Sequence, residues 1–217
     1  MFEIAYDGNF NSLAKARIPA ACEKALEAIE LADYKAPKSM GVARKKKWFG
    51  GMADVEITRG LKLLHRVAND DSRTVTFVDA TSKKYWCAPA DYKDNASPPL
   101  PPVRKPMKAS VNAMVYSVNP NFSFEDTNSV MSALINFGKE MTHAGSGMRL
   151  YLYKSFFDSM QSPAVPEFQQ DIRWLSHIIV HELTHKVLNT HDICYGPGNC
   201  IDLTISDPMY TLLNADN

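Results

Sequence analysis

The sequence IIVHELTHKVLNTHD, at residues 178–192, decides the fold class of this chain. It contains an H-E-x-x-H segment inside an apolar run. Residues four apart lie on one face of an α-helix, so His181 and His185 project together. Two neutral imidazoles on one turn can hold a zinc ion, and Glu182 beside them can act on a metal-bound water. The segment predicts a zinc helix that begins near Gln170; the alternative is a buried helix whose histidines only form hydrogen bonds.

The third zinc ligand has to come from the residues after the helix. Residues 186–217 contain no glutamate, which excludes that ligand within this sequence. His191 has the spacing of the H-E-x-x-H-x-x-G-x-x-H motif of metzincins, but Leu188 stands where a glycine would let the chain reverse cheaply. Asp192 is the other candidate, because Asn189 tolerates the left-handed conformation that ends a helix. Both His191 and Asp192 stay open on this reasoning.

The segment after the helix resembles a known family. Residues 190–196 match the pattern T-x-D-x-x-Y-G of the deuterolysin-like aspzincins, especially their lysine-specific metalloendopeptidase branch, with Asn189 in place of the usual glycine. Residues 206–208 and 214–216 resemble the family's closing segment, and residues 48–50 resemble its W-F-G element. The resemblance covers about residues 170–217 and is thin before them.

This resemblance implies a zinc-dependent endopeptidase with one catalytic Zn²⁺ and a protein or peptide substrate. It implies three zinc ligands: His181, His185 and Asp192. Glu182 becomes the general base and acid, and Tyr195 stabilises the developing oxyanion. Asp216 matches the first of two acidic residues that give the family its preference for lysine at P1′. The second acid would follow Asn217, so the lysine preference is a hypothesis.

The predicted fold is a single α+β domain of the zincin type, mostly helical, with a small sheet beside the H-E-x-x-H helix. Apolar periodicity predicts helices over about residues 12–32 and 53–68, with a break at Pro19. The predicted strands lie at residues 73–79, 110–118 and 148–153. Within this one domain we expect a helical part at about residues 1–87, a proline-rich connector at about 88–108 and a catalytic part at about 109–217.

Composition narrows the range of partners. The chain has 24 basic and 24 acidic residues, which argues against nucleic acid as the main partner. No apolar run is long enough to span a bilayer, so we expect no membrane partner. Pro99, Pro102 and Arg104 fit a pattern that SH3 domains bind, but such segments are more often stiff connectors. The rival interpretation is a non-catalytic metal-binding module that engages a partner through this segment.

The N-terminus and the cysteines give information on the cellular or extracellular compartment in which the protein acts. Residues 1–8 lack the basic and apolar regions of a signal peptide. We therefore expect either a secreted enzyme without its presequence or an effector delivered by a specialised secretion system. The four cysteines, Cys22, Cys87, Cys194 and Cys200, permit disulfides without demanding them. A bridge between Cys194 and Cys200 is one possibility, because a glycine-rich turn lies between them.

Overall fold

The structure is a computed structural model that describes residues 1–39, 42–52, 54–81, 113–114, 126–137, 148–161 and 172–216. The chain divides into two compact units. Unit 1 comprises Met1–Ala25, Asp71–Pro120 and His143–Glu182. Unit 2 comprises Leu26–Asp70, Asn121–Thr142 and Leu183–Asn217. The proline-rich connector and its SH3-type motif lie outside the described residues, and the single-domain organisation stays a prediction.

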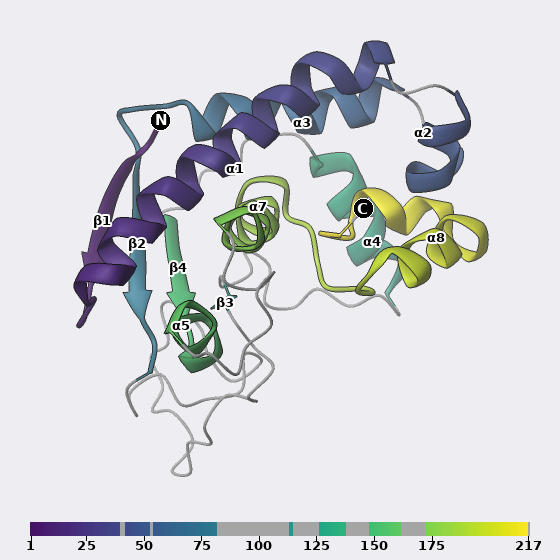
Figure 1. The fold of residues 1–217 in the computed structure, drawn as a ribbon. Coiled ribbons are helices and arrows are strands. Elements are labelled where there is room, and N and C mark those ends of the chain that lie inside the picture. Colours follow the sequence, from purple (N-terminus) through teal and green to yellow (C-terminus); the bar gives the residue numbers. More distant parts are fainter. Residues whose placement is uncertain are drawn as a thin grey trace. The chain divides into compact units, whose positions relative to one another are not determined.

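Unit 1 contains a four-stranded sheet in the order β1-β2-β4-β3. The strands are β1 (Glu3–Asp7), β2 (Thr74–Asp79), β3 (Ala113–Met114) and β4 (Met148–Leu152). β2 pairs in parallel with β1 on one side and with β4 on the other, as Figure 1 shows, whereas β3 is antiparallel to β4. The strands predicted at residues 73–79 and 148–153 are thus present, and the one predicted at 110–118 is described only at 113–114.

The sheet is buried on both faces. Phe77 and Val78 are neighbours in β2 and point to opposite faces, yet both are 0% exposed. Leu150, Tyr151 and Leu152 in β4 are all buried as well. Parallel strands covered on both sides have this continuous apolar character. Apolar burial therefore provides the main stabilisation of unit 1.

Helix α1 (Ser12–Ser39) corrects the predicted break at Pro19, because it runs through the proline without interruption. Proline removes one backbone hydrogen bond and clashes with the preceding turn. Three residues at helical spacing on both sides of it, Ala14, Ile18 and Ala25, are at most 1% exposed. Burial of this face stabilises the helix across the proline, which local propensity alone does not predict.

Two further helices follow the sheet strands of unit 1. α5 (Lys154–Gln161) comes directly after β4 and buries Phe156 completely. α7 (Ile172–Leu188) carries the H-E-x-x-H segment. Its first described residue lies close to the start predicted near Gln170. An α+β fold with several helices and a small sheet is confirmed.

Unit 2 is helical among the residues described. Its elements are α2 (Val42–Phe49), α3 (Asp54–Ala68), α4 (Thr127–Asn136), α8 (Pro197–Ser206) and the 3₁₀ helix η3 (Pro208–Leu212). α2, α8 and η3 pack against one another (Figure 1). None of the helices described in either unit is both long and apolar enough to cross a bilayer.

A glycine allows α2 to approach the chain between α8 and η3. Gly50 has φ +59°, and a Cβ built there would lie 3.0 Å from both the Cβ of Pro208 and the carbonyl oxygen of Thr204. Thr211 also donates from its hydroxyl to the carbonyl oxygen of Phe49, at 3.4 Å. The W-F-G element thus ends where a side chain would be both strained and crowded.

Candidate metal centre

Helix α7 places the two histidines of the H-E-x-x-H segment one turn apart. Leu175, Ile179 and Leu183 are at most 1% exposed, and their burial fixes the rotation of the helix about its axis. His181 and His185 lie on another face and are partly exposed. Glu182 follows His181 directly and is only 5% exposed. The apolar flanks therefore hold the helix in the way the sequence predicts.

The end of α7 turns the chain sharply. Asn189 has φ 57° and is the one non-glycine residue with a positive φ among those described. Its predicted left-handed conformation is confirmed. The hydroxyl oxygens of Thr184 and Thr190 lie 2.9 Å apart across the turn. Asparagine adopts this conformation more easily than most residues, so the turn forms here without the usual glycine.

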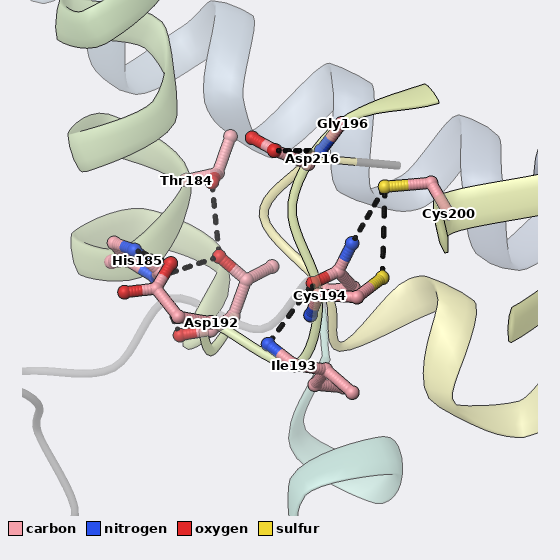
Figure 2. Close-up of polar contacts among 10 residues, drawn as sticks. Thr184, His185, Asp192, Ile193, Cys194, Gly196, Cys200 and Asp216 are labelled. Atoms are coloured by element: carbon pink, nitrogen blue, oxygen red, sulfur yellow. Dashed lines mark hydrogen bonds and ion pairs between the residues drawn. The ribbon is translucent and has the colours of Figure 1, made fainter. Parts of the chain in front are cut away.

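The turn brings residues 190–192 back beside His185 (Figure 2). Nδ1 of His185 lies 2.8 Å from the carbonyl oxygen of Thr190, which can only accept a hydrogen bond. Nδ1 therefore carries a proton, which leaves Nε2 as the ring nitrogen that can bind a metal when the imidazole is neutral. Nε2 lies 3.1 Å from Oδ1 of Asp192. The side chain of His185 is 12% exposed and that of Asp192 is 42% exposed.

Three potential ligand atoms converge at this point. One atom each from His181, His185 and Asp192 lies within 4.8 Å of the others. Any two ligand atoms of a tetrahedral zinc site are roughly 3.3 Å apart when each is about 2.0–2.1 Å from the metal. The 3.1 Å separation of His185 Nε2 and Asp192 Oδ1 is close to that value. A hydrogen bond from the second ring nitrogen to a carbonyl is also usual for metal-binding histidines. The donor set fits zinc.

His191, the alternative third ligand, forms backbone hydrogen bonds with residues near the C-terminus. Its N–H donates to the carbonyl oxygen of Leu213 at 2.6 Å, and its own carbonyl oxygen accepts from the N–H of Ala215 at 3.1 Å. Burial, followed by the nearby His185, lowers the pKa of His191 to about 4, although Asp192 opposes this shift. Its ring is not part of the converging group among the described residues. The geometry favours Asp192 over His191.

Side chains near the C-terminus hold the rest of the loop. We call residues 189–196 the metal loop and residues 213–216 the closing segment. Oδ1 of Asn214, a residue 3% exposed, accepts from the N–H groups of Ile193 and Cys194, each at 3.1 Å. Oδ2 of Asp216 accepts from the N–H of Gly196 at 3.2 Å (Figure 2). The closing segment therefore sets the path of the metal loop.

Asn214 is a functional residue that sequence reasoning missed. It stands within the Asn-Ala-Asp sequence that resembles the family's closing segment, but that pattern does not indicate which backbone groups it contacts. The sequence predicts that Asp216 binds substrate, and in the structure its carboxylate accepts a hydrogen bond from the loop. A carboxylate can accept several hydrogen bonds, so this contact leaves its predicted role untested.

The remaining predicted residue, Tyr195, lies in the metal loop between the contacts of Asn214 and Asp216. Its side chain is 58% exposed. Its carbonyl oxygen accepts from Nδ2 of Asn199 at 3.0 Å. The loop backbone is thus fixed on both sides of a tyrosine whose ring is accessible to a substrate.

Comparison with known proteins agrees with this geometry. Residues 122–217 match the family model of lysine-specific metallo-endopeptidase, the aspzincins. The C-terminal part of the chain, which carries the candidate metal centre, thus matches the aspzincin metallopeptidases. The fold of the chain is also similar to that of a zinc peptidase from Grifola frondosa, with a TM-score of 0.52 and 16% identity over 95% of this chain and 92% of the other. No curated protein sequence matches the chain.

The predicted family, the α+β zincin-type fold and the assignment as a zinc metalloendopeptidase are thereby confirmed. The assignment of individual residues to roles in this protein stays a prediction. So does its preference for a particular residue at P1′.

The thiols of Cys194 and Cys200 are not joined. Their sulfur atoms lie 3.6 Å apart, and neither these two cysteines nor Cys22 is in a disulfide. Burial, followed by the contact with Cys194, raises the pKa of Cys200 to about 12. Cys87 lies outside the described residues.

Proposed function

We propose that this protein hydrolyses peptide bonds with a zinc ion held by His181, His185 and Asp192. The convergence of these three donors carries the proposal. His185 is oriented to bind metal through Nε2, because its Nδ1–H donates to the carbonyl oxygen of Thr190. Zinc, when bound, acts as a Lewis acid toward water and the substrate carbonyl.

Glu182 is the proposed general base and acid. It follows a ligand directly on α7, and its carboxylate is buried, so its position is constrained by the helix. It takes a proton from the attacking water and later delivers one to the leaving amine. A positioned acid–base group contributes roughly 10²–10⁴-fold to rate.

Tyr195 is the proposed donor to the oxyanion. Its exposed ring extends from a loop whose backbone is held by Asn214 and Asp216, so the point from which the side chain projects is fixed. A hydrogen-bond donor aimed at the developing negative charge lowers the barrier more than it strengthens substrate binding.

The test of the mechanism compares four variants with wild type in zinc content and in hydrolysis of casein. Glu182→Gln should retain zinc and lose at least 100-fold in activity, because only the acid–base group is removed. Asp192→Ala should lose both zinc and activity, whereas His191→Ala should keep zinc. Tyr195→Phe should lower kcat and retain KM, with Tyr210→Phe as the matched control.

Two outcomes contradict this proposal. A Glu182→Gln enzyme as active as wild type excludes the acid–base role and points to a non-catalytic metal-binding module. Loss of zinc in His191→Ala together with its retention in Asp192→Ala points to metzincin-type ligation by His191.

We also propose a preference for lysine at P1′, with Asp216 as the acidic residue that attracts the ammonium group. Support comes from its position beside the metal loop and from the description of the matching family. Peptides that differ only in Lys, Arg or Leu at P1′ should be cleaved in that order of kcat/KM. Asp216→Asn should reduce the differences in kcat/KM among the three peptides. Asp202→Asn, which changes an exposed aspartate on α8, should leave those differences unchanged. Equal rates for the three peptides in wild type reject the preference.

The proposal includes action outside the producing cell, after secretion or after delivery by a specialised secretion system. An endopeptidase without a narrow target would otherwise cleave the proteins of its own cell. Immunoblotting of the culture supernatant and of co-cultured recipient cells tests this. Confinement to the cytosol of the producer would contradict it.

A further inference from the structure

A pair of cysteines lies at the metal loop without a role in the proposed chemistry. Sγ of Cys194 and Sγ of Cys200 are 3.6 Å apart, which is van der Waals contact between two sulfur atoms (Figure 2). Cys194 immediately precedes Tyr195, and Cys200 lies in the first turns of α8. The residues between them contain Tyr195 and the start of that helix.

Asn214 contacts both cysteines at once. Its Oδ1 accepts from the backbone N–H of Cys194 at 3.1 Å, and its Nδ2 donates to Sγ of Cys200 at 3.5 Å. The backbone of Cys200 is also bonded, because its N–H donates to the carbonyl oxygen of Gly196 at 3.1 Å. Both cysteine backbones are therefore held in place, and side-chain rotation is the remaining movement needed to bring the sulfur atoms together.

The two thiols differ in access. Cys200 is 1% exposed, whereas Cys194 is partly exposed. A dissolved oxidant therefore meets Cys194 first, and Cys200 is reached only from within the protein.

We propose that Cys194 and Cys200 form a thiol–disulfide site, which a small-molecule disulfide such as oxidised glutathione converts into an intramolecular disulfide around Tyr195. The sulfur of Cys194 first attacks one sulfur of the oxidant, which forms a mixed disulfide and releases one thiol. The sulfur of Cys200 then attacks that of Cys194 and releases the second thiol. The two cysteine protons end on the released thiols, and the two electrons lost by the protein reduce the oxidant.

The bond acts as a brace for the metal loop. It closes the short ring of residues 194–200, and in the chain-entropy model even such a ring destabilises the unfolded chain. The backbone of the metal loop is already held by Asn214 and Asp216, so the oxidised protein keeps the positions of Asp192 and Tyr195. Oxidation should therefore raise stability and leave activity within about twofold.

The experiment treats folded wild type with oxidised glutathione and follows mass, disulfide mapping and thermal unfolding. Wild type should yield a linked Cys194–Cys200 peptide whose mass is lower by two hydrogen atoms than that of the two reduced peptides, and it should unfold about 5 °C higher than the reduced protein. These readouts require neither zinc nor substrate, so they are independent of the proposed peptidase activity.

Single variants test the order of attack. Cys200→Ala should stop at the mixed disulfide and gain the mass of one glutathione at residue 194. Cys194→Ala should gain no glutathione at residue 200 while folded, because the Cys200 thiol is buried. Cys87→Ala and Cys22→Ala are the matched controls, and both should still form the bond.

The proposal is overturned if wild type stops at the mixed disulfide, or if Cys194→Ala and Cys200→Ala react alike. An internal bond that leaves the unfolding temperature unchanged, or one that lowers kcat/KM tenfold, overturns its function as a brace.

Discussion

The sheet of unit 1 and the metal loop of unit 2 are held by different forces. In the sheet, Val75, Phe77, Leu150 and Leu152 are completely buried, and stability comes from apolar surface removed from water. In the metal loop, backbone groups of residues 191–196 are paired with the closing segment, three of them by the side chains of Asn214 and Asp216.

The sheet therefore mainly determines the stability of the fold, whereas the contacts of the metal loop determine the positions of the site atoms. Apolar burial is non-directional and changes in proportion to the area that is buried. Hydrogen bonds depend steeply on distance and angle, so they fix where the atoms of Asp192 and Tyr195 lie. Substitutions in the two regions should therefore have different signatures, one in the free energy of unfolding and the other in zinc affinity and turnover.

The largest loss of stability should follow Phe77→Ala in the sheet. Truncation of a fully buried phenylalanine removes apolar contacts and leaves a cavity, at a cost of about 3–5 kcal/mol in the free energy of unfolding. Urea unfolding measures the loss, with the partly exposed Thr76→Ala as control. The fraction that remains folded should bind zinc with the affinity of wild type. A large loss of zinc affinity in that fraction would contradict the separate roles of the sheet and the metal loop.

The next largest effect should follow Asn214→Ala in the closing segment. It removes the acceptor of the Ile193 and Cys194 N–H groups, which costs about 1–3 kcal/mol of stability. Zinc affinity should fall about 10–100-fold, as is typical when groups that orient a ligand are removed. Competition with a chelator measures this, and the exposed Asn69→Ala is the control. Unchanged zinc affinity would show that the loop keeps its path without Asn214.

A smaller effect should follow substitution at the end of α7. Asn189→Val places a β-branched residue at φ 57° and should cost about 1–2 kcal/mol, whereas Asn189→Gly should be tolerated. Thermal unfolding and zinc titration of both variants provide the comparison. Equal losses in the two would show that the asparagine side chain, and not its backbone conformation, is what the turn needs.

The smallest effect should lie outside both regions, at the start of α4. Hydrogen bonds from the Ser129 side chain and the Asn128 N–H lower the pKa of Asp126 below 3.8. Because the folded pKa is the lower one, this stabilisation is present above the unfolded value and is lost as pH falls through the folded value. The unfolding temperatures of wild type and Asp126→Ala should therefore converge on acidification. Asp202→Asn is the control, and zinc affinity should not change in either variant at neutral pH.

The parts of the site that are close in sequence could be predicted from it. His181, His185 and Asp192 fall within one helix and one turn, so spacing was sufficient to propose the two histidines and to leave His191 and Asp192 as candidates, and the resemblance to aspzincins then selected Asp192. Asn214 could not be found in this way, because its partners Ile193 and Cys194 lie about twenty residues earlier and no local pattern indicates the pairing. The course of α1 through Pro19 also depends on tertiary burial, which local propensity does not contain.

The contact between the metal loop and the closing segment has a consequence for biosynthesis. A ribosome releases the chain from the N-terminus onward, so α7 leaves the exit tunnel before residues 213–216 do. Until those residues emerge, His191, Ile193, Cys194 and Gly196 lack the partners that set the path of the loop. The candidate metal site therefore takes its final form only after residues 213–216 have emerged and paired with the loop.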